Sequence, residues 1–138
     1  MKLAARLSSF ALVLSFVLAD DVRFDNTYDN ADGQLTTVSC STGANGLVTR
    51  GFTTFGSLPS FPNIGATAAV EGFNSVNYGS CWQLAFSGAS IFLTAIDHAG
   101  DGFNIAEAAM NTLTNGQAEQ LGVVQASATM VDASNCGL

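Results

Sequence analysis

The chain has 138 residues, of which four are Lys or Arg and eleven are Asp or Glu, so its formal net charge at pH 7 is −7. Nucleic acids and anionic membranes are poor partners for such a chain, because their binding depends on Lys and Arg side chains that neutralise phosphates. The length suits one domain with a single core, and few charges with abundant Gly, Ser, Thr, Asn and Ala favour a loop-rich β protein.

Residues 1–19 have the pattern of a secretory signal peptide. Lys2 and Arg6 precede an apolar run at 10–18, and Ala19 stands before two aspartates. A membrane anchor is the less favoured alternative, since the apolar run is too short to span a bilayer. We therefore expect a secreted domain over 20–138. Cleavage removes two of the four basic residues and leaves a net charge of 2 − 11 = −9.

The first half of the domain predicts three strands and a long connection. Residues 22–28 alternate as a half-buried strand does, and the turn at 29–33 leads to a second strand at 35–40 that pairs with it as a hairpin. Residues 41–62 are rich in Gly, Ser and Thr, which predicts a long ordered loop with a short helical turn. A third strand is expected at 66–72.

The second half contains the clearest hairpin. Residues 82–86 and 89–96 read as strands, and the turn residues at 87–88 fit a tight connection. A last strand over 123–131 closes the sheet. About six short strands with mostly non-local partners imply a barrel or a sandwich. We favour a barrel, because closure removes exposed edges that a weakly charged secreted protein has few means to protect.

The stretch 93–117 is the most informative part of the sequence. A run of β-suited apolar residues ends at Asp97, so one carboxylate stands at a strand end, where a site can form. A short amphipathic helix follows, because apolar residues recur at helical spacing from Ile105 to Leu113. Asp101 or Asn104 is expected to cap the helix start, and the Asn-Gly pair at 115–116 supplies the stop.

Three cysteines, Cys40, Cys81 and Cys136, remain in a chain that we expect to enter an oxidising compartment. At most one intramolecular disulfide can form, and spacing alone does not select the pair. The sequence has no Cys-x-x-Cys motif, and His98 is its one histidine. We therefore expect neither a metal site nor a redox cofactor.

Eight segments taken together resemble the cerato-platanin family of small secreted fungal proteins. The resemblance covers essentially all of residues 20–138, and the segments are specific as a set, although each alone is weak. They are CSTGANGL at 40–47, FPNIG at 61–65, GFNS at 72–75, GSCW at 79–82, AIDHA at 95–99, GFNI at 102–105, NTLTNGQ at 111–117 and SNCGL at 134–138.

The resemblance implies a fold and a set of partners. The fold would be a mainly β, six-stranded double-ψ β-barrel related to expansin domains, with short helices in the connections. The implied properties are binding of chitin or N-acetylglucosamine oligosaccharides, elicitation of plant defence or host immune responses through an unidentified host-cell receptor, possible self-association, and no established hydrolytic activity. The implied location is extracellular or in the fungal cell wall.

The resemblance also implies a disulfide pattern. Members of the family usually have two bridges, and the first joins the position of Cys40 to the position of Tyr78. Since Tyr78 is not a cysteine here, Cys81–Cys136 is the implied disulfide and Cys40 the implied free thiol. A free cysteine is more often a buried small hydrophobe than a reactive group. Phe73 stands where the family commonly has Trp.

Asp97 is the leading site residue, because it matches an aspartate in the polysaccharide groove of the related expansins. Asn45, Asn74 and Asn104 suit sugar hydroxyls and acetamido groups, since each amide both donates and accepts hydrogen bonds. All four residues have a structural alternative: the asparagines fix turns, and Asp97 accepts backbone N–H bonds. We expect Asp97→Ala to weaken sugar binding without unfolding the protein.

The sequence favours a non-catalytic protein. Glycosidic hydrolysis normally needs two carboxylates, and the only possible partners of Asp97, which are Asp101 and Glu71, have no support from the family pattern. His98 reads as a structural hydrogen-bonding residue, since no motif places a nucleophile beside it. The alternatives are weak expansin-like or glycoside-hydrolase-like activity and an interfacial self-assembling role.

The aromatic residues divide into core and surface candidates. Trp82 directly follows a cysteine of the implied bridge and is expected in the core. Tyr28, Phe52 and Phe55 lie in loop contexts that predict partial exposure.

Overall fold

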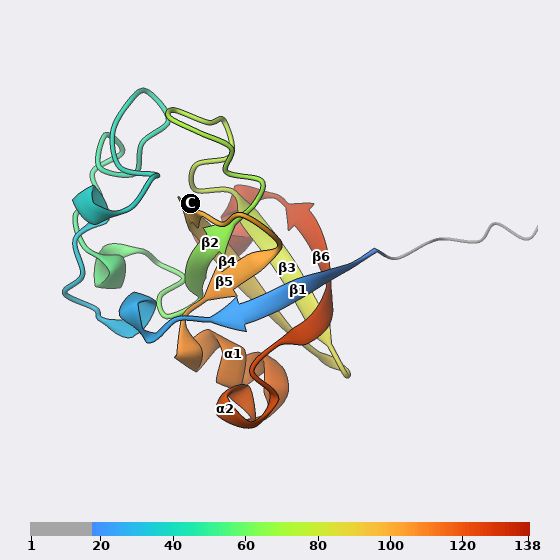
Figure 1. Cartoon of the computed structure of the whole chain (residues 1–138). Helices are drawn as coiled ribbons and strands as arrows, with labels where there is room; N and C mark the ends of the chain where they lie inside the picture. Colours follow the sequence, from blue (N-terminus) through green and yellow to red (C-terminus); the bar gives the residue numbers. More distant parts are fainter. Residues whose placement is uncertain (1–17) are drawn as a thin grey trace, which may run out of the picture.

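A computed structural model of the chain describes residues 18–138 (Figure 1). The predicted signal peptide at 1–19 lies almost entirely outside the described residues. The strands are β1 (Ala19–Phe24), β2 (Ile64–Thr67), β3 (Cys81–Phe86), β4 (Ala89–His98), β5 (Phe103–Ile105) and β6 (Val124–Val131). The helices are α1 (Glu107–Thr114) and α2 (Ala118–Leu121), and short 3₁₀ turns cover Asn26–Asp29, Leu35–Thr37, Phe55–Ser57 and Ala133–Cys136.

The six strands form a closed barrel in the order β1-β5-β2-β4-β3-β6. Two of the pairings, β1 with β5 and β2 with β4, are parallel, and the other four are antiparallel. Closure leaves no strand of the barrel with an unpaired edge. The predicted six-stranded barrel is confirmed.

The β3–β4 hairpin is the part of the barrel that the sequence predicted best. Ser87 and Gly88 connect the strands, and their φ values of 48° and 84° place both in the left-handed region that two-residue hairpin turns require. β4 then continues for ten residues to His98 and pairs with both β3 and β2. The predicted closing strand corresponds to β6.

Three predictions in the first half of the chain were wrong. The strand expected at 22–28 ends at Phe24 and pairs with β5 and β6, so the expected hairpin does not exist. Residues 35–40 form a 3₁₀ turn and irregular backbone that bury Leu35 and Cys40 without joining the sheet. The strand expected at 66–72 covers Ile64–Thr67 instead. The strands that pair with β1 and β2 are distant from them in sequence, and local patterns do not encode such pairings.

The start of α1 was also placed wrongly. Ile105 belongs to β5, which was not predicted, and Ala106 is the N-cap residue of α1. Neither Asp101 nor Asn104 caps the helix. The carboxylate of Asp29 does so, accepting the backbone N–H groups of Glu107 and Ala108 at 2.8 and 2.9 Å. The predicted stop is confirmed, because Asn115 is left-handed with φ 56°.

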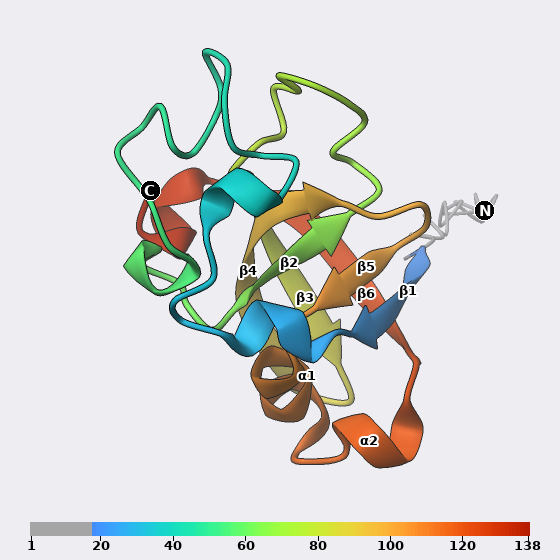
Figure 2. The same ribbon diagram turned by 60° about the vertical axis from the view of Figure 1, so that its left-hand side comes forward.

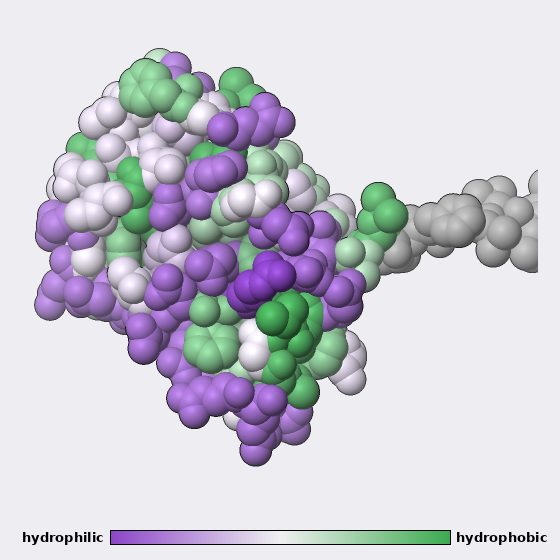
Figure 3. Space-filling model, in the orientation of Figure 1, coloured by the Kyte–Doolittle hydropathy of each residue, from purple (hydrophilic) through white to green (hydrophobic). Residues whose placement is uncertain are grey.

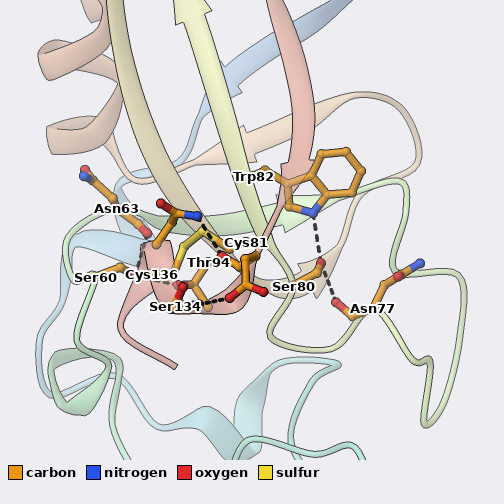
Figure 4. Close-up of a disulfide and its surroundings, with 11 residues drawn as sticks. Ser60, Asn63, Asn77, Ser80, Cys81, Trp82, Thr94, Ser134 and Cys136 are labelled. Atoms are coloured by element: carbon orange, nitrogen blue, oxygen red, sulfur yellow. Dashed lines mark hydrogen bonds between the residues drawn. A yellow bond between two sulfur atoms is a disulfide. The ribbon is translucent and has the colours of Figure 1, made fainter.

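A disulfide between Cys81 and Cys136 joins the start of β3 to the last 3₁₀ turn (Figure 4). Beside it, Trp82 Nε1 donates to Ser80 Oγ at 2.9 Å, and the Trp82 ring makes an edge contact with Phe103 at 5.5 Å between centroids. Trp82 therefore packs against the core, as expected. Tyr28 and Phe55 were expected to be partly exposed, but both are buried.

The loops and the helices lie at opposite ends of the barrel. In Figures 1 and 2, the connections between the first 3₁₀ turns and β2, and between β2 and β3, gather at one end, whereas α1 and α2 cover the other. Figure 3 shows an apolar patch over the segment that leads from α2 to β6, where Leu121 and Val123 are exposed. Within residues 18–138, no helix is long and apolar enough to cross a bilayer.

Candidate functional site

Asp97 lies near the end of β4 at the loop end of the barrel, and its half-buried carboxylate is held by four hydrogen bonds. Oδ1 accepts the backbone N–H of Ser39 at 3.0 Å, the Ser39 hydroxyl at 2.8 Å and the backbone N–H of His98 at 2.9 Å. Oδ2 accepts the Tyr28 hydroxyl at 2.9 Å. These bonds tie β4 to two distant loops. The structure thus gives Asp97 a structural role, and Asp97→Ala is expected to weaken the fold, contrary to our sequence-based expectation.

The groups around Asp97 are kept in their neutral forms. Burial, followed by the charge and hydrogen bond of the Asp97 carboxylate, raises the pKa of the Tyr28 hydroxyl, which therefore remains a donor. Burial raises the pKa of the Cys40 thiol to about 12, although a backbone hydrogen bond from Gly79 acts in the opposite direction. Cys40 is fully buried and unpaired with another cysteine. It is therefore an unreactive thiol in the folded protein.

A groove of about 290 Å³ opens beside Asp97. Both Ser39, which binds Asp97, and His98, which follows it, form part of the wall. Phe73 also lines the groove and is 77% exposed, so an aromatic side chain is available at its rim. The complete lining is Ser39, Glu71, Gly72, Phe73, Tyr78 and His98.

The groove wall carries polar groups that can bind a polar ligand. The imidazole Nδ1 of His98 is in hydrogen-bond contact with the Val70 carbonyl oxygen, which leaves Nε2 as its second polar atom. Glu71 supplies an exposed carboxylate. No group of three or more His, Cys, Asp or Glu side chains within 18–138 is arranged to hold a metal ion.

The other carboxylate considered from the sequence, Asp101, is directed elsewhere. It is exposed beyond β4, and its carboxylate lies 4.0 Å from Nη1 of Arg23 on β1. Asp101 does not line the groove, whereas Glu71 does.

Asn45 and Asn74 contact each other. The Asn45 backbone N–H donates to Oδ1 of Asn74 at 2.8 Å, and Nδ2 of Asn45 donates to the Asn74 carbonyl at 3.0 Å. Tyr78 adds a third bond, because its hydroxyl accepts the Asn74 backbone N–H at 2.9 Å. This cluster, which we call the Asn45–Asn74 clamp, joins the loops at 41–51 and 72–79. Asn74 directly follows Phe73 and so helps to place the groove rim.

Asn104 does not join the other predicted residues. It is the central residue of β5 and pairs with Arg23 of β1 and Ala66 of β2. Sequence reasoning missed Ser39 and did not assign Tyr78 to the site. Tyr78 could have been assigned to the site because it occupies a position where the resembled family has a cysteine. Nothing in the sequence indicated a role for Ser39.

A family model described as Cerato-platanin matches residues 21–138. The chain belongs to the cerato-platanin family. It is 50% identical over 137 residues to the Allergen Asp f 15 homolog of Arthroderma benhamiae, covering 98% of this chain and 65% of that relative. The chain thus spans less than two thirds of the length of that protein.

Two solved structures of the family share the fold. Cerato-platanin 2 from M. perniciosa is 56% identical with a TM-score of 0.83, over 87% of this chain and 99% of that one. The solution structure of the fungal elicitor Cerato-Platanin is 34% identical with a TM-score of 0.75, over 84% and 95% of the two chains. The relative from Arthroderma benhamiae is named as the homolog of an allergen, and the protein of the solution structure is named as a fungal elicitor.

Proposed function

We propose that this protein is a secreted, non-catalytic member of the family that binds chitin-type oligosaccharides in the groove beside Asp97. The observation that carries the proposal is an exposed aromatic side chain, Phe73, at the rim of a groove with polar walls. Aromatic rings pack against the apolar faces of sugar rings, while hydroxyl, amide and imidazole groups bind sugar hydroxyls. Phe73 supplies the first kind of contact, and Ser39 and His98 supply the second.

The role of Asp97 in this proposal is to hold the groove together. Its carboxylate binds Ser39 and borders His98, and both line the groove. Asn74 acts similarly, because the Asn45–Asn74 clamp fixes the loop that carries Phe73. Asn104 lies on β5 and is a more distant candidate for the same ligand.

The test is a residue-resolved NMR titration with N-acetylglucosamine oligomers. Phe73→Ala should abolish most of the shifts at His98 and Gly72, because it removes the stacking surface. Val76→Ala is the matched control, since Val76 is 83% exposed on the same loop and does not line the groove. Equal titrations in the two variants would refute the assignment of the groove.

We infer that elicitation of plant defence or host immunity depends on a host-cell receptor that binds the same loop end of the barrel. The exposed Phe73 and Val76 support this inference, because exposed apolar side chains on a loop mark contact surfaces. Infiltration of leaves with wild type, Phe73→Ala and Val76→Ala measures the defence response of each. Comparing these responses with the sugar titrations separates elicitation from sugar binding. A variant that loses sugar binding but retains elicitation would show that the receptor does not require the groove.

A weak hydrolytic activity on wall polysaccharide is the second candidate, and the position of Glu71 in the groove wall favours it. The assay measures reducing ends released from chitin and cellulose. Release that Glu71→Gln abolishes would establish an enzyme. We expect no release, because the second carboxylate, Asp97, is committed to four hydrogen bonds.

A further inference from the structure

A second hollow, of about 270 Å³, lies at the helical end of the barrel, away from the groove. It is formed by the β3–β4 turn on one side and by the C-terminal end of α1 on the other, which Figures 1 and 2 show next to each other. Phe86 and Ser87 come from the turn, and Thr114, Asn115 and Gln117 from the end of the helix. We call it the α1 hollow.

The polar side chains of the α1 hollow are free to bind a ligand. Among residues 18–138, the Ser87 hydroxyl and the side-chain amides of Asn115 and Gln117 have no hydrogen-bonding partner. Thr114 differs, because its hydroxyl donates to the Met110 carbonyl and accepts the Gln117 backbone N–H. All three residues are exposed to solvent and line the same small hollow, so their polar groups are accessible to a ligand there.

The electrostatic character of the hollow favours a cation. The last carbonyl groups of α1 give this end a partial negative charge, and no basic residue stands in the last turn of the helix. The two arginines of the described chain are occupied elsewhere: Arg23 pairs with Asp21, and Arg50 donates to the Tyr78 carbonyl. The excess of acidic residues over the whole chain adds to this preference.

Phe86 adds an aromatic wall. It is half-buried and packs against the core, so its ring is held in place. Ammonium groups bind to aromatic faces, and hydroxyl groups bind to amides. A volume of about 270 Å³ is large enough for one sugar ring. We propose that the α1 hollow binds a protonated amino sugar, with the ammonium group toward the helix end and Phe86, and the hydroxyl groups toward Ser87, Asn115 and Gln117.

This site is independent of the proposed function of the groove. The groove would take N-acetylated sugars, which carry no charge, whereas the α1 hollow requires a free amine. The two sites lie at different ends of the barrel and share no lining residue. A failure at one leaves the other unaffected.

The experiment is an NMR titration of the protein with glucosamine at pH 6, where the amine is protonated, and in parallel with N-acetylglucosamine and glucose. Glucosamine should shift the side-chain amides of Asn115 and Gln117 and the backbone N–H of Ser87, and added salt should weaken the binding. Equal shifts with either neutral sugar, or no shift at these residues with glucosamine, would overturn the proposal.

Two variants with a matched control test the recognition. Gln117→Lys puts an ammonium group into the hollow and should weaken glucosamine binding about tenfold or more. Gln120→Lys adds the same charge to an exposed position of α2 outside the lining and should bind as wild type. Asn115→Gly preserves the left-handed backbone and removes one amide, so it should retain the fold and bind less tightly. Equal weakening by both lysine variants would indicate general charge repulsion and refute the site.

Discussion

The Tyr28 hydroxyl donates a 2.9 Å hydrogen bond to Oδ2 of Asp97, joining two residues that are 69 positions apart in the chain. Tyr28 lies in the 3₁₀ turn after β1, and Asp97 lies near the end of β4. The bond fixes the first loop over the barrel at the point where the candidate groove begins. The same carboxylate binds Ser39, so one acidic side chain organises three segments.

Tyr28→Phe tests this relationship with little loss of packing. The ring remains, but Oδ2 of Asp97 loses the hydrogen bond from the Tyr28 hydroxyl. Since hydrogen bonds to charged groups are worth more than neutral ones, we expect the free energy of unfolding to fall by about 2 kcal/mol. Urea denaturation at pH 7 measures the change. Ser39→Ala is the comparison: it removes an exposed bond and should cost about 0.5–1 kcal/mol.

Alkaline pH should destabilise the protein through its buried thiol and phenol. Burial raises the pKa of Cys40 from its ordinary value of 9.0 to about 12, and raises the pKa of Tyr28 as well. Above pH 9 the unfolded chain releases protons that the folded protein retains, so the free energy of unfolding declines as pH rises. Below pH 9 this contribution is constant.

Urea midpoints measured from pH 7 to pH 11 check the decline. In Cys40→Ala the decline should be shallower, because one of the two groups is gone. A thiol reagent at pH 8 gives an independent measurement: Cys40 should react only in denaturant. Rapid reaction of the folded protein would contradict the buried, protonated thiol.

The local parts of the fold were predictable, and the non-local parts were not. The β3–β4 hairpin and the end of α1 each depend on residues adjacent in sequence, such as the left-handed Ser87 and Asn115. β5 escaped prediction because it has three residues and exists through its pairing with β1 and β2. The capping residue of α1 was not predicted, because Asp29 lies 78 residues before the first residue whose N–H it binds.

The candidate site also has a part that local sequence predicts and a part that it does not. Asp97 was found because an acidic residue directly after a buried strand is a local signal. Its partner Ser39 is 58 residues away and stands in a segment that was predicted as a strand. The contact between Asn45 and Asn74 gives both amides structural partners, which no sequence pattern distinguishes from amides free to bind a sugar.

The Asn45–Asn74 clamp adjoins buried Tyr78, whose hydroxyl accepts the Asn74 backbone N–H. Asn74→Gly should loosen the loop at 72–79 without straining its backbone, because Asn74 has φ 57° and glycine adopts this conformation freely. We expect faster amide hydrogen exchange at 72–79 and a loss of about 1 kcal/mol. Exchange within β3 and β4 serves as the internal reference. Unchanged exchange in the loop would show that the clamp does not restrain it.

The Cys81–Cys136 disulfide closes a segment of 55 residues. By loop entropy in the unfolded chain, its loss should lower the free energy of unfolding by about 4 kcal/mol. The double variant Cys81→Ser with Cys136→Ser, compared with wild type by thermal denaturation, measures this contribution. Cys40→Ala controls for removal of a buried sulfur without a cross-link and should cost less.

Gly65 provides the sharpest test of the barrel geometry. A Cβ atom at this position would lie 2.6 Å from the Asn104 carbonyl oxygen and 2.7 Å from the Ile105 Cα, which are backbone atoms of the paired strand β5. Since neither atom can move without breaking the β2–β5 pairing, Gly65→Ala should destabilise the protein by about 3 kcal/mol. Gly100→Ala is the matched control, because a Cβ there meets nothing within 4 Å. Comparable stabilities of the two variants would contradict the close approach of β2 and β5, and with it the strand order on which the groove depends.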